Sequence, residues 1–342
     1  MELKTAFAAL FLSFMSLNPS CAQNIKPEFV MINGHQQWIY YIGDDTSKQV
    51  ILFLHGGPGT PETPFLVKYN QNLKEDFIVV CWEQRGAGKS YNKKIPDSTM
   101  TIDQFVEDCH AVTQHIKKKF NFQKIYLMGH SWGTLIGIKS IKKYPHDYLG
   151  YFALAQISNT LKEEQVTYQW LINQSQYENN RKALRQLNEI GWPSEENRYS
   201  LKQVFIKIKW VNYYGGAAFY QDPKGYKKLV KIVITTPVYN FREKLKYLKS
   251  EKFSLDHLHD EIMTLDLFEE VNTLNVPIVF IHGTGDYQVP LVVAKEYYYF
   301  INSPYKKFIE FKNCAHGLLI EQPEKFKKTI LEEVESINAI SR

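Results

Sequence analysis

Cysteine is scarce in this sequence, and the few cysteines form no recognisable pattern. The 342 residues include only Cys21, Cys81, Cys109 and Cys314. Their wide spacing differs from the paired framework of a disulfide-stapled domain, and no two stand in the CxxC arrangement of a structural zinc site. We therefore predict no metal site, and we expect the last three cysteines to be buried structural thiols.

A strong charge of one sign is also missing. Lysine and arginine number 41 against 36 acidic residues, which leaves a formal net charge of +5. The lysine clusters at 117–119 and 142–143 lie near the ends of expected helices, where positive charge suits the helix dipole. We read them as solvated helix faces and expect no nucleic-acid partner.

The N-terminus differs in kind from the rest of the chain. Lys4 precedes an apolar block at residues 6–17, and small residues follow, which is the layout of a secretory signal peptide. The block is shorter than the roughly 20 residues that span a bilayer. Residues 1–22 are therefore predicted to be a signal peptide, with a mature chain that begins at Gln23 and is secreted or periplasmic. The alternative is lipidation at Cys21, which would attach the protein to a membrane, although Asn18 stands where an aliphatic residue is usual.

Short apolar runs alternate with helical patterns over most of the chain. Strands are expected at 29–32, 37–42, 50–54, 77–81, 125–128, 151–157, 278–281 and 307–311, the first two joined by an Asn33-Gly34 turn. Helices are expected at 101–120, 132–144, 291–300 and 323–337. Unbroken apolar strands that alternate with helices predict an α/β fold, with a mostly parallel central sheet covered by helices on both faces.

The alternation stops between residues 159 and 268. This segment is rich in Tyr, Trp, Lys and Glu at helical spacing, and is broken by "GWPSEEN" and "YYGGAAFYQDPKG". It is predicted to be a helical cap inserted into the core. The core would then comprise residues 23–158 and 269–342.

The central candidate site is "GHSWG", residues 129–133, at a predicted strand-to-helix junction. Gly-x-Ser-x-Gly in this context is a nucleophile elbow, in which a sharp turn lifts the serine above the sheet edge and glycines avoid clashes. The helix N-terminus that follows favours negative charge. Ser131 is therefore the predicted nucleophile.

A serine needs a base, and elbow enzymes carry the order Ser, acid, His. Asp286 follows the strand predicted at 278–281, and His316 follows the strand at 307–311, both at carboxyl strand ends where such sheets carry their sites. His316 is the only histidine after Asp286, whereas His282 is expected to hold loop structure. We predict His316 as general base and Asp286 as the residue that orients its ring.

An oxyanion hole would complete this site. The backbone N–H of Trp132, directly after the nucleophile, is one predicted donor. The loop "HGGPG" at 55–59 follows a predicted strand and supplies the other, for which we choose Gly57.

A second loop, "CWEQRGAGKS", ends like a phosphate-binding P-loop. That motif requires a glycine five residues before Gly88, where this chain has Glu83, so we expect no nucleotide. Arg85 is instead expected to brace the loop through buried carbonyl groups.

Together these blocks resemble the α/β-hydrolase superfamily, and within it the prolyl iminopeptidase-like serine peptidases. The matching blocks are "HGGPG", "WEQRGAGKS", "GHSWGT" and the pair Asp286 and His316, with Glu83 in place of the family's usual aspartate. They cover roughly residues 30–157 and 268–330. The resemblance implies an α/β-hydrolase fold with a cap, no cofactor, and cleavage of an amide bond in a peptide through an acyl-enzyme.

Within that resemblance, the leading expectation is an aminopeptidase that releases N-terminal residues, proline above all. The alternatives are a carboxylesterase or other small-molecule hydrolase with the same triad, and a non-catalytic binding protein on this scaffold. An aminopeptidase requires acidic cap residues for the substrate's ammonium group. The candidates are Glu195 and Glu196, with Asp256, Asp260 and Glu261 also considered, and Trp210 is a candidate pocket wall with Trp170, Trp192, Tyr213 and Tyr214.

Overall fold

The computed structural model describes residues 25–340 of the chain. The predicted signal peptide and the possible lipid site at Cys21 lie outside the described residues. Within the described range, no helix is both long and apolar enough to cross a bilayer. Cys81, Cys109 and Cys314 are buried free thiols, as predicted.

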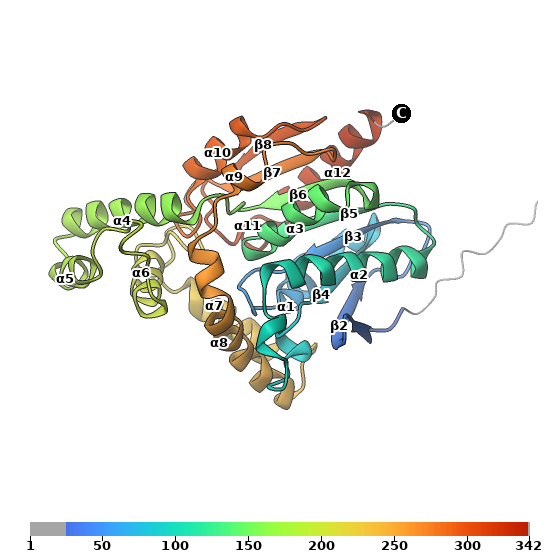
Figure 1. The fold of residues 1–342 in the computed structure, drawn as a ribbon, viewed down its shortest axis with the longest axis horizontal. Coiled ribbons are helices and arrows are strands. Elements are labelled where there is room, and N and C mark those ends of the chain that lie inside the picture. The colour runs from blue at the N-terminus through green and yellow to red at the C-terminus, as the bar shows by residue number, and fades with distance from the viewer. Residues whose placement is uncertain (1–24, 341–342) are drawn as a thin grey trace, which may run out of the picture.

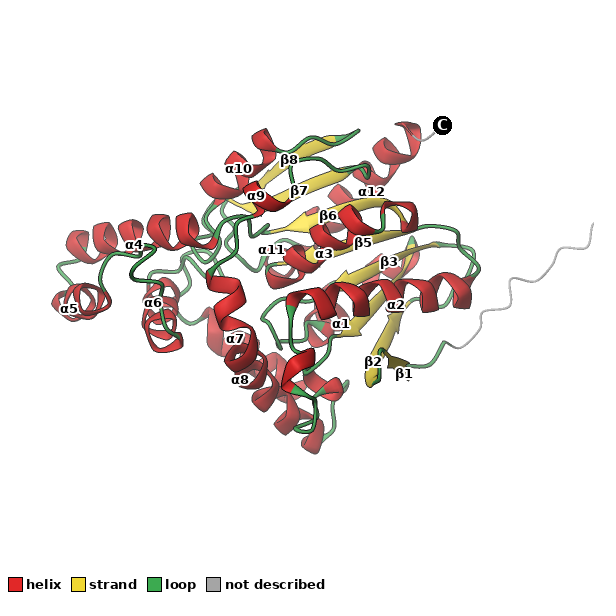
Figure 2. Cartoon of the chain, in the orientation of Figure 1, coloured by secondary structure: helices red, strands yellow, loops and turns green. Residues whose placement is uncertain are grey.

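An eight-stranded sheet runs through the molecule in the order β1-β2-β4-β3-β5-β6-β7-β8 (Figure 2). The β1–β2 and β2–β4 pairs are antiparallel and all the others are parallel. This confirms the predicted mostly parallel sheet. The strands are β1 (Glu28–Ile32), β2 (His35–Ile42), β3 (Gln49–Leu54), β4 (Phe77–Glu83), β5 (Ile125–His130), β6 (Tyr148–Leu154), β7 (Ile278–Gly283) and β8 (Lys306–Phe311).

Helices cover both faces of the sheet, and the central strands are therefore buried on both sides. One apolar cluster joins α2 and α3 to the sheet, and a second joins α1, α11 and α12 to the opposite face (Figure 1). The core helices are α1 (Thr63–Tyr69), α2 (Ile102–Phe120), α3 (Trp132–Lys143), α9 (Leu267–Glu270), α10 (Leu291–Phe300), α11 (Leu318–Glu321) and α12 (Pro323–Ile340), with 3-10 turns at Gln71–Glu75, Gly88–Ser90, Asp97–Thr99 and Pro145–Asp147.

Local signals account for several element boundaries. Helix α2 begins because the side chain of Thr101 accepts a hydrogen bond from the N–H of Gln104, and it ends at Asn121 in the left-handed conformation. Strand β6 begins and ends three residues earlier than predicted. Ala155 adopts a positive φ of 53°, which terminates the extended run.

Five helices between β6 and β7 occupy most of the segment predicted as a cap. They are α4 (Thr160–Tyr177), α5 (Arg181–Ile190), α6 (Leu201–Tyr213), α7 (Gly225–Thr235) and α8 (Phe241–Met263). Helices α4 to α6 share an apolar cluster of their own and project to one side of the sheet (Figure 1). Helix α8 packs back onto the core: the Ser250 hydroxyl donates a hydrogen bond to the carbonyl of Gly59.

Arg85 makes buried contacts, but the predicted bracing through buried carbonyls is wrong, because its main partner is a carboxylate and its one carbonyl partner belongs to the exposed Asn33. One guanidinium nitrogen donates to the carbonyl of Asn33 at 3.2 Å. The guanidinium also forms two hydrogen bonds with Asp108, of 2.8 and 3.0 Å, and both side chains are buried. A bidentate pair of this kind fixes geometry as well as charge.

Glu163 fastens the first turn of α4 to the end of the core. Its Oε1 accepts hydrogen bonds from the N–H groups of Ser158, at 2.7 Å, and Asn159, at 3.4 Å. The side chain is buried, and burial raises the pKa of Glu163 to about 8. The folded protein therefore keeps a proton on Glu163 at pH values where the unfolded chain has lost it.

We predict that Glu163→Gln flattens the pH dependence of stability between pH 5 and 7.5. In the wild type, the raised pKa makes the free energy of unfolding fall as pH rises through this window, by up to about 1.4 kcal/mol per pH unit for one group. Glutamine keeps the accepting oxygen but does not titrate. Urea titrations at several pH values measure the slope, and the exposed Glu189→Gln serves as control. An unchanged slope in Glu163→Gln would contradict the prediction.

Candidate active site

Ser131 lies at a strained turn between β5 and α3. Its backbone has φ 52° and ψ −121°, a conformation that costs energy in a residue with a side chain. A Cβ atom at Gly133 would lie 2.1 Å from the carbonyl oxygen of Leu54, and one at Gly129 would lie 2.5 Å from the carbonyl oxygen of Gly133. Both positions therefore require glycine, and the elbow geometry follows from these close approaches.

The predicted acid and base meet in a buried pair. The Nδ1–H of His316 donates to Oδ2 of Asp286 at 2.7 Å. The other carboxylate oxygen accepts from the backbone N–H groups of Gln288 and Val289, each at 2.9 Å. With both oxygens occupied, the carboxylate is fixed in orientation and so is the imidazole that it holds.

The charge of Asp286 is stabilised by its surroundings. Burial alone would raise the pKa of Asp286, but the adjacent His316 ring and the further His282 ring outweigh burial and lower it below its usual value. His282 Nε2 also donates to the carbonyl of Val289 at 2.8 Å. His282 therefore holds the acid loop in shape, which is the role expected from its position.

His130 connects the turn at Ser131 to His316, the predicted base. Its Nε2 lies 2.9 Å from the carbonyl oxygen of His316, and the two rings lie 4.8 Å apart. Because His130 directly precedes Ser131, this contact brings Ser131 and His316 to the same edge of the sheet. Among the described residues, no direct hydrogen bond joins Ser131 Oγ to His316. In free enzymes such bonds are often longer than in substrate complexes.

Glu62 is the residue at this site that sequence reasoning missed. Its Oε1 lies 2.6 Å from Nδ1 of His130, and both side chains are buried. A Cβ atom built on Gly56 would lie 3.3 Å from Cβ of Ser131 and 3.4 Å from Oε1 of Glu62, so the carboxylate and the nucleophile flank the same glycine. The only signal in the sequence is an acidic residue three positions after "HGGPG".

The contacts of His130 bear on the protonation state of its ring. Both ring nitrogens face oxygen acceptors, whereas a neutral imidazole has only one N–H to donate. Burial would lower the pKa of His130, but the charge and hydrogen bond of Glu62 and the His316 carbonyl raise it. These contacts favour the protonated form of the His130 ring. The second oxygen of Glu62 is buried and has no hydrogen-bond partner among the described residues.

The "HGGPG" loop is tied to the elbow through "WEQRG". His55 donates from Nδ1 to the carbonyl of Gly56 at 2.8 Å, and its Nε2 accepts from the backbone N–H of Gln84 at 3.1 Å. The Gln84 side chain in turn accepts from the indole N–H of Trp132 at 2.9 Å. Burial lowers the pKa of His55 to about 4, which keeps the ring in the neutral form that these two contacts require.

The two predicted oxyanion donors are the backbone N–H groups of Trp132 and Gly57. Trp132 is the first residue of α3, so its backbone N–H has no partner within the helix. Gly57 has φ 115°, and a Cβ atom built on the neighbouring Gly56 would lie 3.3 Å from Cβ of Ser131. The loop is thus held beside the nucleophile, and the assignment of Gly57 as donor stays a prediction.

A cap loop contacts both the acid loop and the base loop. The carbonyl of Gly216 accepts from the N–H of Tyr287 at 2.8 Å, and the carbonyl of Ala217 accepts from the N–H of His316 at 2.9 Å. Tyr287 also stacks on Trp170 of α4, with ring centroids 4.0 Å apart. The "YYGG" break therefore brings the cap to the two loops that carry the pair.

The three proposed substrate-binding residues lie elsewhere. Glu195 pairs with Arg198 and is 63% exposed, and Glu196 accepts from the Ser194 hydroxyl in the same surface loop. Trp210 is only 3% exposed, because it packs in the core of the cap. None of their contacts in the described range involves the predicted triad, so these assignments are not retained. Among the other aromatic candidates, only Trp170 contacts a residue adjacent to the triad.

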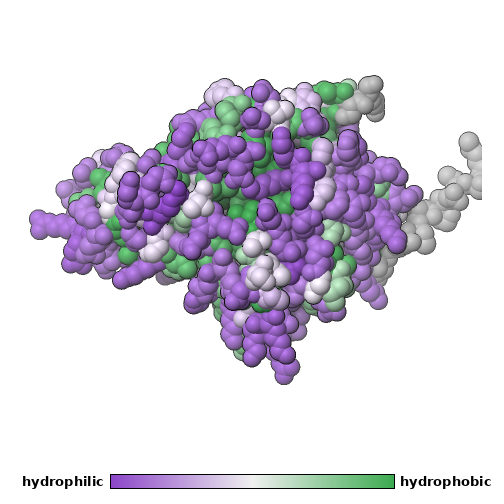
Figure 3. Space-filling view, in the orientation of Figure 1, coloured by the Kyte–Doolittle hydropathy of each residue, from purple (hydrophilic) through white to green (hydrophobic). Residues whose placement is uncertain are grey.

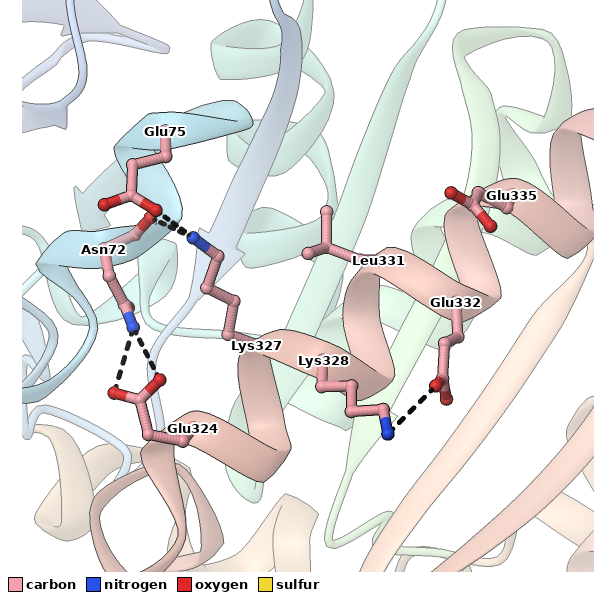
Figure 4. A pocket seen from close by; sticks show the side chains of 8 residues that line it. All are labelled: Asn72, Glu75, Glu324, Lys327, Lys328, Leu331, Glu332 and Glu335. Atoms are coloured by element: carbon pink, nitrogen blue, oxygen red, sulfur yellow. Dashed lines mark hydrogen bonds and ion pairs between the residues drawn. The ribbon is translucent and has the colours of Figure 1, made fainter.

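A surface groove between α12 and the Gln71–Glu75 turn is unrelated to this site. Figure 4 shows that charged side chains line it and pair across it, as Lys327 does with Glu75 and Asn72 with Glu324 (Figure 4). The face seen in Figure 3 is mostly hydrophilic, and apolar residues line the hollow at its centre (Figure 3).

Comparison with known proteins agrees with this geometry. Residues 49–323 match the family model described as the alpha/beta hydrolase fold. The chain belongs to the α/β-hydrolase family. Ser131, Asp286 and His316 all lie within the matched range.

Relatives of this α/β-hydrolase include named peptidases. It is 33% identical over 303 residues to the probable aminopeptidase YbaC of Bacillus subtilis, covering 87% of this chain and 93% of that protein. It is 23% identical to the proline iminopeptidase of Lactobacillus delbrueckii subsp. bulgaricus, covering 90% and 96% respectively. Its fold is similar to that of a proline iminopeptidase-related protein from Thermus thermophilus, with a TM-score of 0.64, 16% identity, and coverage of 92% of this chain and 98% of the other.

We predict that a fluorophosphonate probe labels this α/β-hydrolase at Ser131 only. Such probes react with a serine hydroxyl that is activated by a nearby base, and the elbow places Ser131 at the same edge of the sheet as the imidazole of His316. Labelling should disappear in Ser131→Ala and persist in Ser336→Ala, a change at a half-buried position of α12. Asp286→Asn should slow labelling by about 10⁴-fold, because the ring of His316 loses its orienting acceptor. Gel fluorescence and peptide mapping measure both effects, and labelling retained in Ser131→Ala would remove this residue from the site.

Proposed function

We propose that this chain is a serine aminopeptidase that releases N-terminal residues, with proline as the leading candidate. Ser131 Oγ attacks the scissile carbonyl, and its proton passes to Nε2 of His316. The N–H groups of Trp132 and Gly57 stabilise the oxyanion. His316 then protonates the leaving amine, and a water molecule, deprotonated by the same ring, hydrolyses the acyl-enzyme to regenerate Ser131.

One observation carries this proposal beyond a general hydrolase. Glu62 places a buried carboxylate beside Ser131, and its Oε2 has no hydrogen-bond partner among the described residues. A buried acceptor without a partner is costly, and a charged donor would satisfy it. The ammonium group of a substrate's N-terminal residue is such a donor. It belongs to the same residue as the scissile carbonyl, so it lies close to the bond that is cleaved. A neutral ester would leave the oxygen unpaired.

Two further features support the same reading. The 33% identical relative is named as a probable aminopeptidase, and other relatives are named as proline iminopeptidases. Tyr287, directly after Asp286, forms a stacked aromatic wall with Trp170. An aromatic wall of this kind suits the apolar ring of proline.

We predict that proline anilide with a free amine is cleaved faster than N-blocked proline anilide, alanine anilide or short-chain nitrophenyl esters. Glu62→Gln should lower kcat/KM for the free-amine anilides by about 10- to 100-fold, the value of a hydrogen bond to a charged group. Esters in the same variant are the internal control, because damage to His130 or His316 would slow them equally. Cleavage of esters alone by the wild type would favour a carboxylesterase, and no labelling or turnover would favour a binding protein.

We also propose that the chain is exported, with cleavage after Ala22 and release to the periplasm or medium. The leader composition described above is the support for this proposal. Mass spectrometry of the protein recovered from an expressing bacterium should give an N-terminus at Gln23. A mass that corresponds to an acylated Cys21 would establish the lipid-anchored alternative, and an intact Met1 in the cytosol would contradict export.

A further inference from the structure

The outer face of α8 reverses the usual pattern of a helix packed on a core. Phe241, Leu245 and Leu248 recur at spacings of four and three residues, so they share one face. They are 75%, 44% and 65% exposed. The opposite face, which packs on the protein, carries Tyr247 and the small polar Ser250 and Ser254. A surface helix normally buries its apolar stripe rather than presenting it to solvent.

This apolar face cannot rotate inward. A Cβ atom at Gly59 would lie 2.5 Å from the backbone oxygen of Ser250 and 2.7 Å from Oγ of Ser254, so helix and loop are in direct contact. The Ser250 hydroxyl also donates to Gly59. The N-terminal half of α8 forms the lower tip of the molecule in Figure 1, away from the sheet (Figure 1). The exposed residues therefore point away from the protein because of how the helix is anchored.

Unpaired positive charge borders the apolar face. Arg242, Lys246 and Lys249 are exposed, and Lys244 is half-buried. None of these four forms an ion pair within residues 25–340. Between residues 224 and 252 the only acidic residues are Glu243, which pairs with Lys89, and Glu251. The preceding helix α7 adds two exposed basic residues, Lys227 and Lys231. Its Ile234 is also 60% exposed.

We propose that this α8 face, defined as Phe241, Leu245 and Leu248 with Arg242, Lys244 and Lys249, binds an anionic phospholipid surface. Apolar side chains on one helix face with lysine and arginine on its flanks are the combination that seats a helix in the headgroup boundary of a bilayer. The basic residues are attracted to the negative surface potential. A second copy of this chain fits less well, because pairing two such faces would bring like charges together.

Vesicle co-sedimentation tests this proposal with the chain that begins at Gln23, which retains every described residue. We expect binding to vesicles with 30% phosphatidylglycerol in phosphatidylcholine. We expect little binding to pure phosphatidylcholine, and weaker binding in 0.5 M salt. The variant Phe241→Ser/Leu245→Ser/Leu248→Ser should lower the partition coefficient at least 10-fold. Arg242→Gln/Lys244→Gln/Lys249→Gln should lower it about 100-fold, because each basic residue near an anionic surface contributes roughly fivefold.

The matched control is Tyr177→Ser/Val292→Ser/Tyr299→Ser, which removes three exposed apolar side chains outside α8. It should bind as the wild type does. All variants should keep the wild-type melting temperature and label at Ser131, so loss of binding is separated from loss of fold. The proposal is overturned by absence of binding to anionic vesicles, or by equal losses in the α8 and control variants. A concentration-dependent dimer that only the apolar α8 variant abolishes would replace it with self-association.

Discussion

The site depends on the close approach of helix α3 to strand β3. Gly133 lies so near the carbonyl of Leu54 that no side chain fits between them. That approach forces the chain to turn sharply at Ser131, which takes the strained φ and ψ values of the elbow. It also aims the N-terminus of α3 at the space above the sheet edge, where the N–H of Trp132 is free of helical hydrogen bonds. A single steric constraint thus positions the predicted nucleophile and one predicted oxyanion donor together.

The family's sequence blocks act as one hydrogen-bonded unit around that turn. His55 from the first block receives the N–H of Gln84 from the second, and the Gln84 side chain holds the indole of Trp132 from the third. Glu83 extends the unit to the cap, since its buried carboxylate accepts from the backbone N–H of Lys89 and from the hydroxyl of Tyr239, just before α8. Burial raises the pKa of Glu83 to about 7. The longer side chain at the position where the family usually has aspartate therefore lies between the core and the cap.

The sequence predicted the elements that carry a strong periodic signal and the residues fixed by chain order. The buried strands and the helices α2, α3, α10 and α12 fall within a few residues of their predicted places. Asp286 and His316 were selected by position after late strands, and the structure brings them within 2.7 Å. The Gly-x-Ser-x-Gly spacing located the elbow because the close approach of neighbouring carbonyl groups leaves room only for glycine at these two positions.

Contacts between distant segments were not predictable in the same way. Glu62 meets His130 across 68 positions of sequence, and no spacing rule links an acidic residue after one loop to a histidine at the end of a later strand. The acidic residues of the cap looked alike in the sequence, and only the fold shows that Glu195 and Glu196 lie in a surface loop. Trp210 shows the same ambiguity, because an aromatic residue at helical spacing serves a core as well as a pocket.

Helix α8 contacts the core through one face and exposes the other. Its inner face touches Gly59, at the end of the loop that also carries Gly56 beside Ser131. Its outer face carries the exposed apolar residues and unpaired lysines. The hydrogen bond from the Ser250 hydroxyl to the Gly59 carbonyl joins the helix directly to the "HGGPG" loop. Small residues at 250 and 254 suit this contact, since the loop at Gly59 approaches both of them closely. The small size of the two serines is thus explained by the closeness of the loop, which leaves no room for a large packing residue there.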